Sequence, residues 1–196
     1  MTEVGTNLVA ILLAAGSGSR FGGDGHKLHA EIGGRTVFSW ALQAVVAAQI
    51  GPVIVVTGAV ELEIDDQDVT IAHNSNWNNG IASSLQVGIS AAGKFNADSI
   101  VVGLGDQPFV VTSAWRAVAH SPSPIAVATY QSQRGNPVKL DAQIWPSLPT
   151  TGDEGARSVF ALFSDLVQEV PCEGSSGDID TLEDLERMSL ELRKNH

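Results

Sequence analysis

An uninterrupted apolar run from Leu8 to Ala14 stops at a glycine-rich segment that extends to Gly34. A strand without polar residues is typical of a parallel sheet that is covered by helices on both faces. Similar runs follow at residues 53–57, 69–73, 99–104 and 125–129, and segments with helical periodicity at 36–48 and 81–92 lie between them. This alternation predicts an α/β fold: a three-layer, doubly wound, mostly parallel sheet of the Rossmann-like kind.

The remaining segments complete the predicted order of elements. We expect Thr36, Thr112 and Thr181 to cap helices, residues 154–163 and 182–192 to be helical, and 167–170 to be extended. Prolines at 137, 146 and 149 prevent long regular elements, so residues 131–152 are predicted to be an irregular insertion over the working edge of the sheet. The length of 196 residues favours one domain, 1–196.

Composition narrows the class of partner and the compartment. Lysine and arginine number 11 against 22 aspartates and glutamates, and a net charge of −11 argues against a sequence-independent hold on nucleic acid. The single cysteine, Cys172, cannot form an internal disulfide, which favours a reducing compartment. The apolar run at the start is too short to span a bilayer. We therefore expect a soluble, cytoplasmic protein that binds neither nucleic acid nor membrane.

The glycine-rich segment, Gly16-Ser17-Gly18-Ser19-Arg20-Phe21-Gly22-Gly23 and on to Lys27, is suited to phosphate. Glycines let successive backbone amides approach an anion closely, and the two cations can neutralise its charge. The alternative is a flexible loop with solvated cations. The segment is not a Walker A loop, since His26 precedes the lysine and Leu28 follows it; Phe21 replaces the third glycine of a dinucleotide site. With these two motifs excluded, the segment is interpreted as a phosphate-binding loop of a third type.

Carboxylates at predicted strand ends complement this loop. Asp106 follows an apolar strand, where a charge needs a solvent cleft or a cation. Asp178 and Asp180 alternate around Ile179, so both face one side of an extended segment. One or two carboxylates with phosphates and water suit Mg²⁺, so the three aspartates are candidate ligands, with the choice between Asp178 and Asp180 open. Alternatively, these aspartates only cap turns and the last helix.

Six motifs in order resemble nucleotidylyltransferases, and within them the molybdenum cofactor cytidylyltransferases. They are Leu13-Ala14-Ala15-Gly16-x-Gly18-x-Arg20 with Lys27, Trp77-x-x-Gly80-x-x-Ser83-Ser84, Gly105-Asp106-Gln107-Pro108, Arg134-Gly135-Asn136-Pro137, Gly152-Asp153-Glu154-Gly155-Ala156-Arg157 and Asp178-Ile179-Asp180-Thr181. The resemblance runs from about Leu8 to Met188. It implies transfer of CMP from CTP to the phosphate of molybdopterin, with Mg²⁺, and possible delivery to a client molybdenum hydroxylase.

The resemblance also implies roles for particular residues. Arg20, Lys27 and Asp106 would be catalytic. The nucleotide would contact Leu13, Ala14, Ala15, Gly16, Ser17, Gly18, Ser83, Ser84 and Gln107, and the acceptor would contact Asn136, Asp153 and Glu154, so that the irregular insertion lies on the acceptor side. The incoming phosphate is already ionised, so the reaction needs charge neutralisation rather than a general base.

Other functions fit the same residues. An enzyme of the same fold could use methylerythritol phosphate or a sugar phosphate as acceptor, or GTP as donor, because the fold does not set the substrate. A non-catalytic carrier of the mature cofactor is a further alternative, although the loop lysine and the candidate metal-binding aspartates are all present.

Overall fold

Apolar strands form a sheet at the centre of the computed structural model, which describes residues 7–22 and 25–194, with side chains through residue 190. The strand order is β5 (Val69–His73), β4 (Val53–Thr57), β1 (Leu8–Ala14), β6 (Ser99–Leu104), β8 (Gln133–Asp141), β7 (Ile125–Tyr130) and β9 (Val167–Pro171). The first four strands are parallel, β8 is antiparallel to both neighbours, and β9 is parallel to β7.

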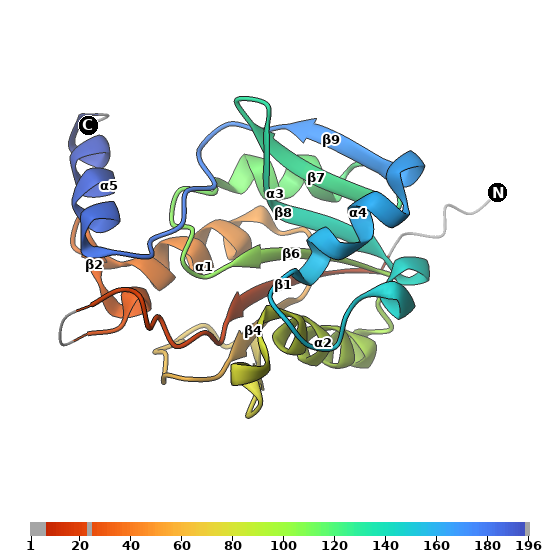
Figure 1. Ribbon diagram of the computed structural model, residues 1–196, viewed down its shortest axis with the longest axis horizontal. Helices are drawn as coiled ribbons and strands as arrows, with labels where there is room; N and C mark the ends of the chain where they lie inside the picture. Colours follow the sequence, from red (N-terminus) through yellow and green to blue (C-terminus); the bar gives the residue numbers. More distant parts are fainter. Residues whose placement is uncertain (1–6, 23–24, 195–196) are drawn as a thin grey trace.

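Helices cover both faces of the sheet (Figure 1). Helices α1 (Val37–Ala48) and α3 (Thr112–Ala119) pack on one face, where alternate β1 residues such as Ala10 and Leu12 are buried. The other face buries Ile11 and Leu13 beneath α2 (Ile81–Ala92), the 3₁₀ turn η4 (Ala142–Ser147) and α4 (Ser158–Leu162). Because both faces of β1 are covered, its run without polar residues is explained, and the predicted three-layer fold class is confirmed.

A third, smaller core lies beside the sheet and joins distant parts of the chain. Helix α5 (Leu182–Lys194) contacts the hairpin of β2 (Glu31–Ile32) and β3 (Arg35–Thr36), outside the sheet in Figure 1. Phe21 of the glycine-rich segment and Ile179 are buried in this cluster with Ile32, Val37 and Met188. The third core thereby fixes the glycine-rich segment and the Asp178–Asp180 segment relative to each other.

The prediction of an irregular insertion at 131–152 is wrong for residues 133–141, which form strand β8 in the middle of the sheet. Val138 pairs with Val127, yet Gly135 pairs with Ala128, so two residues of β8 are inserted at a register shift. Pro137 is one of those two and makes no ladder bond there, which is how a bulge accommodates a proline inside a strand. The turn at residues 131–132 and the end of the segment beyond η4 lack regular structure.

Two of the three predicted caps are confirmed. The Thr36 hydroxyl accepts from Ser39 N at 3.1 Å, and the Thr181 hydroxyl accepts from Asp184 N at 3.1 Å. Thr112 is not a cap: it is the first residue of α3, and its hydroxyl donates to the Ala44 carbonyl at 3.2 Å, which ties α3 to α1. Among the described helices, none is long and apolar enough to cross a membrane.

Candidate active site

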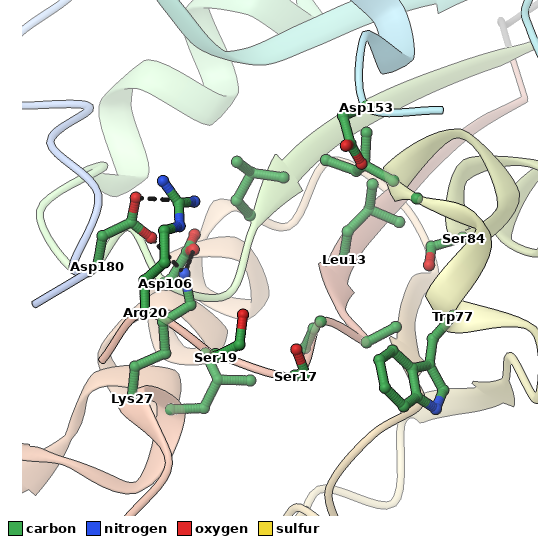
Figure 2. Close-up of a pocket in the computed structure, with 18 of the residues that line it drawn as sticks. Leu13, Ser17, Ser19, Arg20, Lys27, Trp77, Ser84, Asp106, Asp153 and Asp180 are labelled. Carbon is green, nitrogen blue, oxygen red and sulfur yellow. Dashed lines mark hydrogen bonds and ion pairs between the residues drawn. The ribbon is translucent and has the colours of Figure 1, made fainter. Parts of the chain in front are cut away.

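A cavity of about 490 Å³ opens beyond the carboxyl ends of β1 and β6, a size typical of a small-molecule site. In an open parallel sheet, ligands bind at this edge. Its walls come from the glycine-rich segment, from the turn η2 (Trp77–Asn79) with the start of α2, and from the segments after β6 and before α5. The lining residues labelled in Figure 2 are Leu13, Ser17, Ser19, Arg20, Lys27, Trp77, Ser84, Asp106, Asp153 and Asp180.

Arg20, Lys27, Asp106 and Asp180 gather at one end of this cavity, at the left of Figure 2. Lys27 Nζ lies 2.5 Å from Asp106 Oδ2 and 2.8 Å from Asp180 Oδ1. Arg20 binds the other oxygen of Asp180 at 3.0 Å, although 78% of the arginine side chain remains exposed. Residues from three segments, predicted separately as cations and carboxylates, therefore meet as one network.

Burial decides how strongly this network holds its charges. Only 12% of the Lys27 side chain and 17% of the Asp106 side chain is exposed. Burial lowers the pKa of Lys27, but the charges and hydrogen bonds of Asp106 and Asp180 outweigh it, so the pKa lies above the usual lysine value. Lys27 therefore remains a cation at any physiological pH.

The three candidate metal ligands are near one another without enclosing a site. Among the described residues, no three carboxylate, imidazole or thiolate groups converge as a complete metal cage. Asp106 Oδ1, however, is buried and has no hydrogen-bond partner in the described part of the chain. A buried carboxylate oxygen without a donor is a suitable cation ligand. The residues thus fit a divalent ion that is bound by one or two carboxylates and completed by phosphates and water.

Asp178 faces a different neighbour from Asp180. The side chain of Gln107 is buried, and its amide nitrogen donates to Asp178 Oδ1 and to the Ser176 carbonyl. The amide of Asn136 donates to Gln107 Oε1 at 3.2 Å, so the three side chains form a chain of hydrogen bonds. Burial, followed by the charge of Asp106, raises the pKa of Asp178 above the usual range. None of these three side chains lines the cavity.

The glycine-rich segment takes its shape from His26. One ring nitrogen, Nε2, lies 3.0 Å from the Gly16 carbonyl, and Nδ1 accepts from Leu28 N at 3.2 Å. Burial lowers the pKa of His26, in keeping with the neutral ring that the bond from Leu28 requires. Gly18 has φ +61°, and a Cβ there would lie 3.0 Å from the ring, so the close approach needs glycine. Gly23 and Asp24 lie outside the described residues.

Among the described residues that line the cavity, none at its opposite end is a cation. Ser84 lines it, as do Leu13, Trp77 and Ile81. The buried amide of Asn74 donates to the hydroxyls of both Ser83 and Ser84, at 2.9 and 3.0 Å. Ser83 also donates to the Gly80 carbonyl at 2.8 Å, so its hydroxyl serves the turn rather than the cavity.

The two acidic residues predicted to contact the acceptor are placed differently from each other. Asp153 lines the cavity at the end with Ser84 and Leu13, far from the charged network in Figure 2. Glu154 is exposed and does not line the cavity. Of the nucleotide residues predicted from the sequence, those from 13 to 18 and Ser84 line the cavity, whereas Ser83 and Gln107 lie behind it.

Sequence reasoning missed several residues that shape the cavity. Asn74 holds both serines, but a lone asparagine after a short strand carries no recognisable signal. Gly58 is needed because a Cβ there would lie 2.7 Å from the Ala15 carbonyl and 2.9 Å from the Trp77 Cβ. Trp77 belongs to the second of the six sequence motifs, and that motif could have suggested a place for it in the cavity wall.

Comparison with known proteins agrees with this geometry. A family model described as the MobA-like NTP transferase domain matches residues 10–170. The chain belongs to this family. It is therefore a MobA-related nucleotidyltransferase, as the motifs of the glycine-rich segment and of Asp106 led us to expect.

This MobA-like chain is also similar to individual proteins. It is 28% identical to the purine catabolism protein PucB of Bacillus subtilis over 90% of this chain and 93% of PucB. It is 33% identical to the bifunctional protein GlmU of Corynebacterium aurimucosum over 56% of this chain, a match that spans 24% of GlmU.

Solved structures share the fold over nearly the whole MobA-like chain. A nucleotidyl transferase from Methanothermobacter thermautotrophicus superposes with a TM-score of 0.82 at 26% identity, covering 98% of this chain and 100% of that one. Rv0371c of Mycobacterium tuberculosis, in a complex with manganese, has a TM-score of 0.74 at 22% identity and covers 94% and 99% of the two chains.

Proposed function

We propose that this protein transfers CMP from CTP to the phosphate of a molybdopterin-type cofactor and releases pyrophosphate. The observation that carries a nucleotidyl transfer is the division of one cavity into a charged end and an end without cations. Arg20, Lys27 and Asp106 lie at the first, and Ser84 with the end of β1 lies at the second. A nucleoside triphosphate has the same division between its phosphates and its base.

The choice of CTP and of a pterin acceptor rests on the sequence motifs. Ala14-Ala15-Gly16, without a second glycine in the middle position, and Gly105-Asp106-Gln107-Pro108 resemble the cytidylyl branch. Backbone from Leu13 to Gly18 would hold the nucleotide, with Ser84 near the pyrimidine or ribose. Gln107 lies behind the cavity and would act through Asp178 and Asn136 rather than on the base.

The chemistry is an in-line displacement at the α-phosphorus. An oxygen of the acceptor phosphate forms the new phosphorus–oxygen bond, and the bond to the bridging oxygen breaks, so that its electron pair leaves with pyrophosphate. The acceptor is already ionised, hence no residue needs to remove a proton. Arg20 and Lys27 would reduce the repulsion between the two anions and stabilise the departing charge.

A divalent cation, which we take to be Mg²⁺, would neutralise phosphate charge at the same end. Asp106, with its unpartnered Oδ1, is the first ligand we assign, joined by Asp180 or Asp178. Asn136 does not line the cavity, but its amide donates to Gln107, the residue that follows Asp106, and we place it near the acceptor on the strength of its motif. A client molybdenum hydroxylase would receive the product.

Pyrophosphate release tests this function. The enzyme with Mg²⁺ is supplied with each of CTP, GTP, ATP and UTP, and with molybdopterin, methylerythritol phosphate or a sugar phosphate as acceptor. We expect turnover with CTP and molybdopterin. Turnover with methylerythritol phosphate alone would establish the other acceptor class, and turnover with GTP the other donor. Tight binding of mature cofactor without pyrophosphate release would instead indicate a carrier.

A further inference from the structure

Asp153 is held against the end of the cavity that lacks cations. Gly152 N donates to the Asn79 carbonyl at 2.8 Å, and Ala82 N donates to the Gly152 carbonyl at 3.0 Å. These two bonds tie the segment before η5 (Gly155–Arg157) to the start of α2. A Cβ on Gly80 would lie 2.7 Å from Asp153 Oδ1, so the carboxylate rests directly on the glycine. The position of Asp153 is therefore set by backbone contacts.

The position separates Asp153 from the phosphates of any nucleotide in this cavity. Figure 2 shows Asp153 beside Leu13 and Ser84, while Arg20 and Lys27 lie at the other end with Asp106 and Asp180. A nucleotide whose phosphates reach those cations along the glycine-rich segment places its base next to Asp153. An acceptor phosphate, which must approach the α-phosphorus, lies toward Asp106 instead.

The chemistry of the carboxylate then restricts the base. Within the described residues, no side chain or backbone group donates a hydrogen bond to Asp153, and the side chain is exposed to the cavity. An ionised carboxylate only accepts hydrogen bonds, so it needs donors from its ligand. Cytosine presents an amino group at C4, whereas uracil presents a carbonyl oxygen at the same position. A carboxylate binds the first and repels the second.

We propose that Asp153 contacts the base of the donor nucleotide and selects an amino-bearing pyrimidine over its keto counterpart, rather than contacting the acceptor. This inference rests on the proposed nucleotidyl transfer. Its neighbour Glu154 offers a matched control, because Glu154 carries the same charge one residue away and does not line the cavity.

The test compares wild type, Asp153→Asn and Glu154→Gln in two measurements. Calorimetric titration with CTP and UTP in Mg²⁺, without acceptor, measures base preference; steady-state pyrophosphate release measures the acceptor KM. An asparagine can rotate to donate to a keto oxygen, so Asp153→Asn should reduce the CTP-to-UTP affinity ratio by about 10- to 100-fold. Glu154→Gln should leave the ratio unchanged, and Asp153→Asn should not change the acceptor KM.

Two other results have different meanings. If Asp153→Asn keeps the wild-type CTP-to-UTP ratio, or raises the acceptor KM instead, the role proposed for Asp153 is wrong while the nucleotidyl transfer stands. If wild type binds no nucleoside triphosphate, the proposed function itself fails and takes this inference with it. A wild type that prefers UTP refutes base selection by this carboxylate directly.

Discussion

Replacing Lys27 with methionine tests whether the gap between Asp106 and Asp180 holds a divalent cation once the lysine charge is removed. Its ammonium lies between Asp106 Oδ2 and Asp180 Oδ1, at 2.5 and 2.8 Å. Methionine preserves the length and apolar stem of the side chain but removes the charge. The two carboxylates then face each other without a counterion, and a divalent cation can enter between them.

The expected cost follows from burial. Removing one partner of a buried ion pair costs about 3–5 kcal/mol, and since 27% of the Asp180 side chain is exposed we take the lower end, about 3 kcal/mol. For a chain of this size, about 1 kcal/mol lowers the melting temperature by about 2–4 °C, so the variant should melt about 6–12 °C lower. Mg²⁺ should recover much of this loss, because a ligand that binds only the folded state stabilises it.

Thermal unfolding with and without Mg²⁺ measures both the loss of stability and its recovery by the metal. Lys94→Met is the control, because Lys94 is exposed and makes none of the salt bridges found among the described residues. The control should melt like wild type. Titration of Mn²⁺ should show tighter binding to the Lys27 variant than to wild type. Equal stabilisation of both proteins by Mg²⁺, or unchanged melting of the Lys27 variant, would refute the reasoning that the lysine charge alone keeps these two carboxylates stable together.

Three further perturbations address other parts of the site. Gly80→Ala places a Cβ 2.4 Å from the Gly152 carbonyl oxygen at a residue with φ +91°. We therefore expect urea unfolding to show a loss of about 1–3 kcal/mol in stability, together with weaker nucleotide binding. Gly93→Ala is the control, because a Cβ on Gly93 meets nothing within 4 Å. Because the pKa of His26 is lowered in the folded protein, the unfolded chain takes up a proton at a higher pH than the folded chain does. The free energy of unfolding should therefore fall as the pH drops below about 6.5. Unfolding experiments on either side of this pH should show a smaller fall for His26→Gln. Asp106→Asn should reduce pyrophosphate release by about 100-fold or more while circular dichroism shows an intact fold; full activity would remove Asp106 from the proposed metal site.

The sequence could predict those parts of the fold that depend on local pattern. The run from Leu8 to Ala14 and its successors identify strands covered on both faces, and Thr36 and Thr181 identify helix starts because capping is a short-range interaction. Strand β8 was missed because Pro137 normally excludes a central strand. The strand accommodates Pro137 because its register against β7 shifts at this point. Such a shift depends on the partner strand, so the sequence around the proline does not reveal it.

The candidate site shows the same limit. Arg20, Lys27 and Asp106 could be found because their chemistry requires charges at strand ends, and the parallel sheet brings strand ends together. Ser83 and Gln107 have the right residue types at the right places in the chain, yet their side chains turn away to satisfy Gly80 and Asp178. The direction of a polar side chain depends on which hydrogen-bonding group lies within its reach, and only the folded structure brings that group close.

The charges of the site give a physical reason for the proposed metal to accompany the nucleotide. At the end of the cavity where phosphates would lie, the charges of Arg20 and Lys27 are matched by those of Asp106 and Asp180, so this network offers a phosphate no excess of positive charge. The chain as a whole carries −11, so its distant charges do not correct this. A triphosphate that entered alone would meet no net attraction there, whereas a divalent cation would make the same end positive. Removing the proposed metal should therefore weaken nucleotide binding itself, and not only slow the transfer that follows.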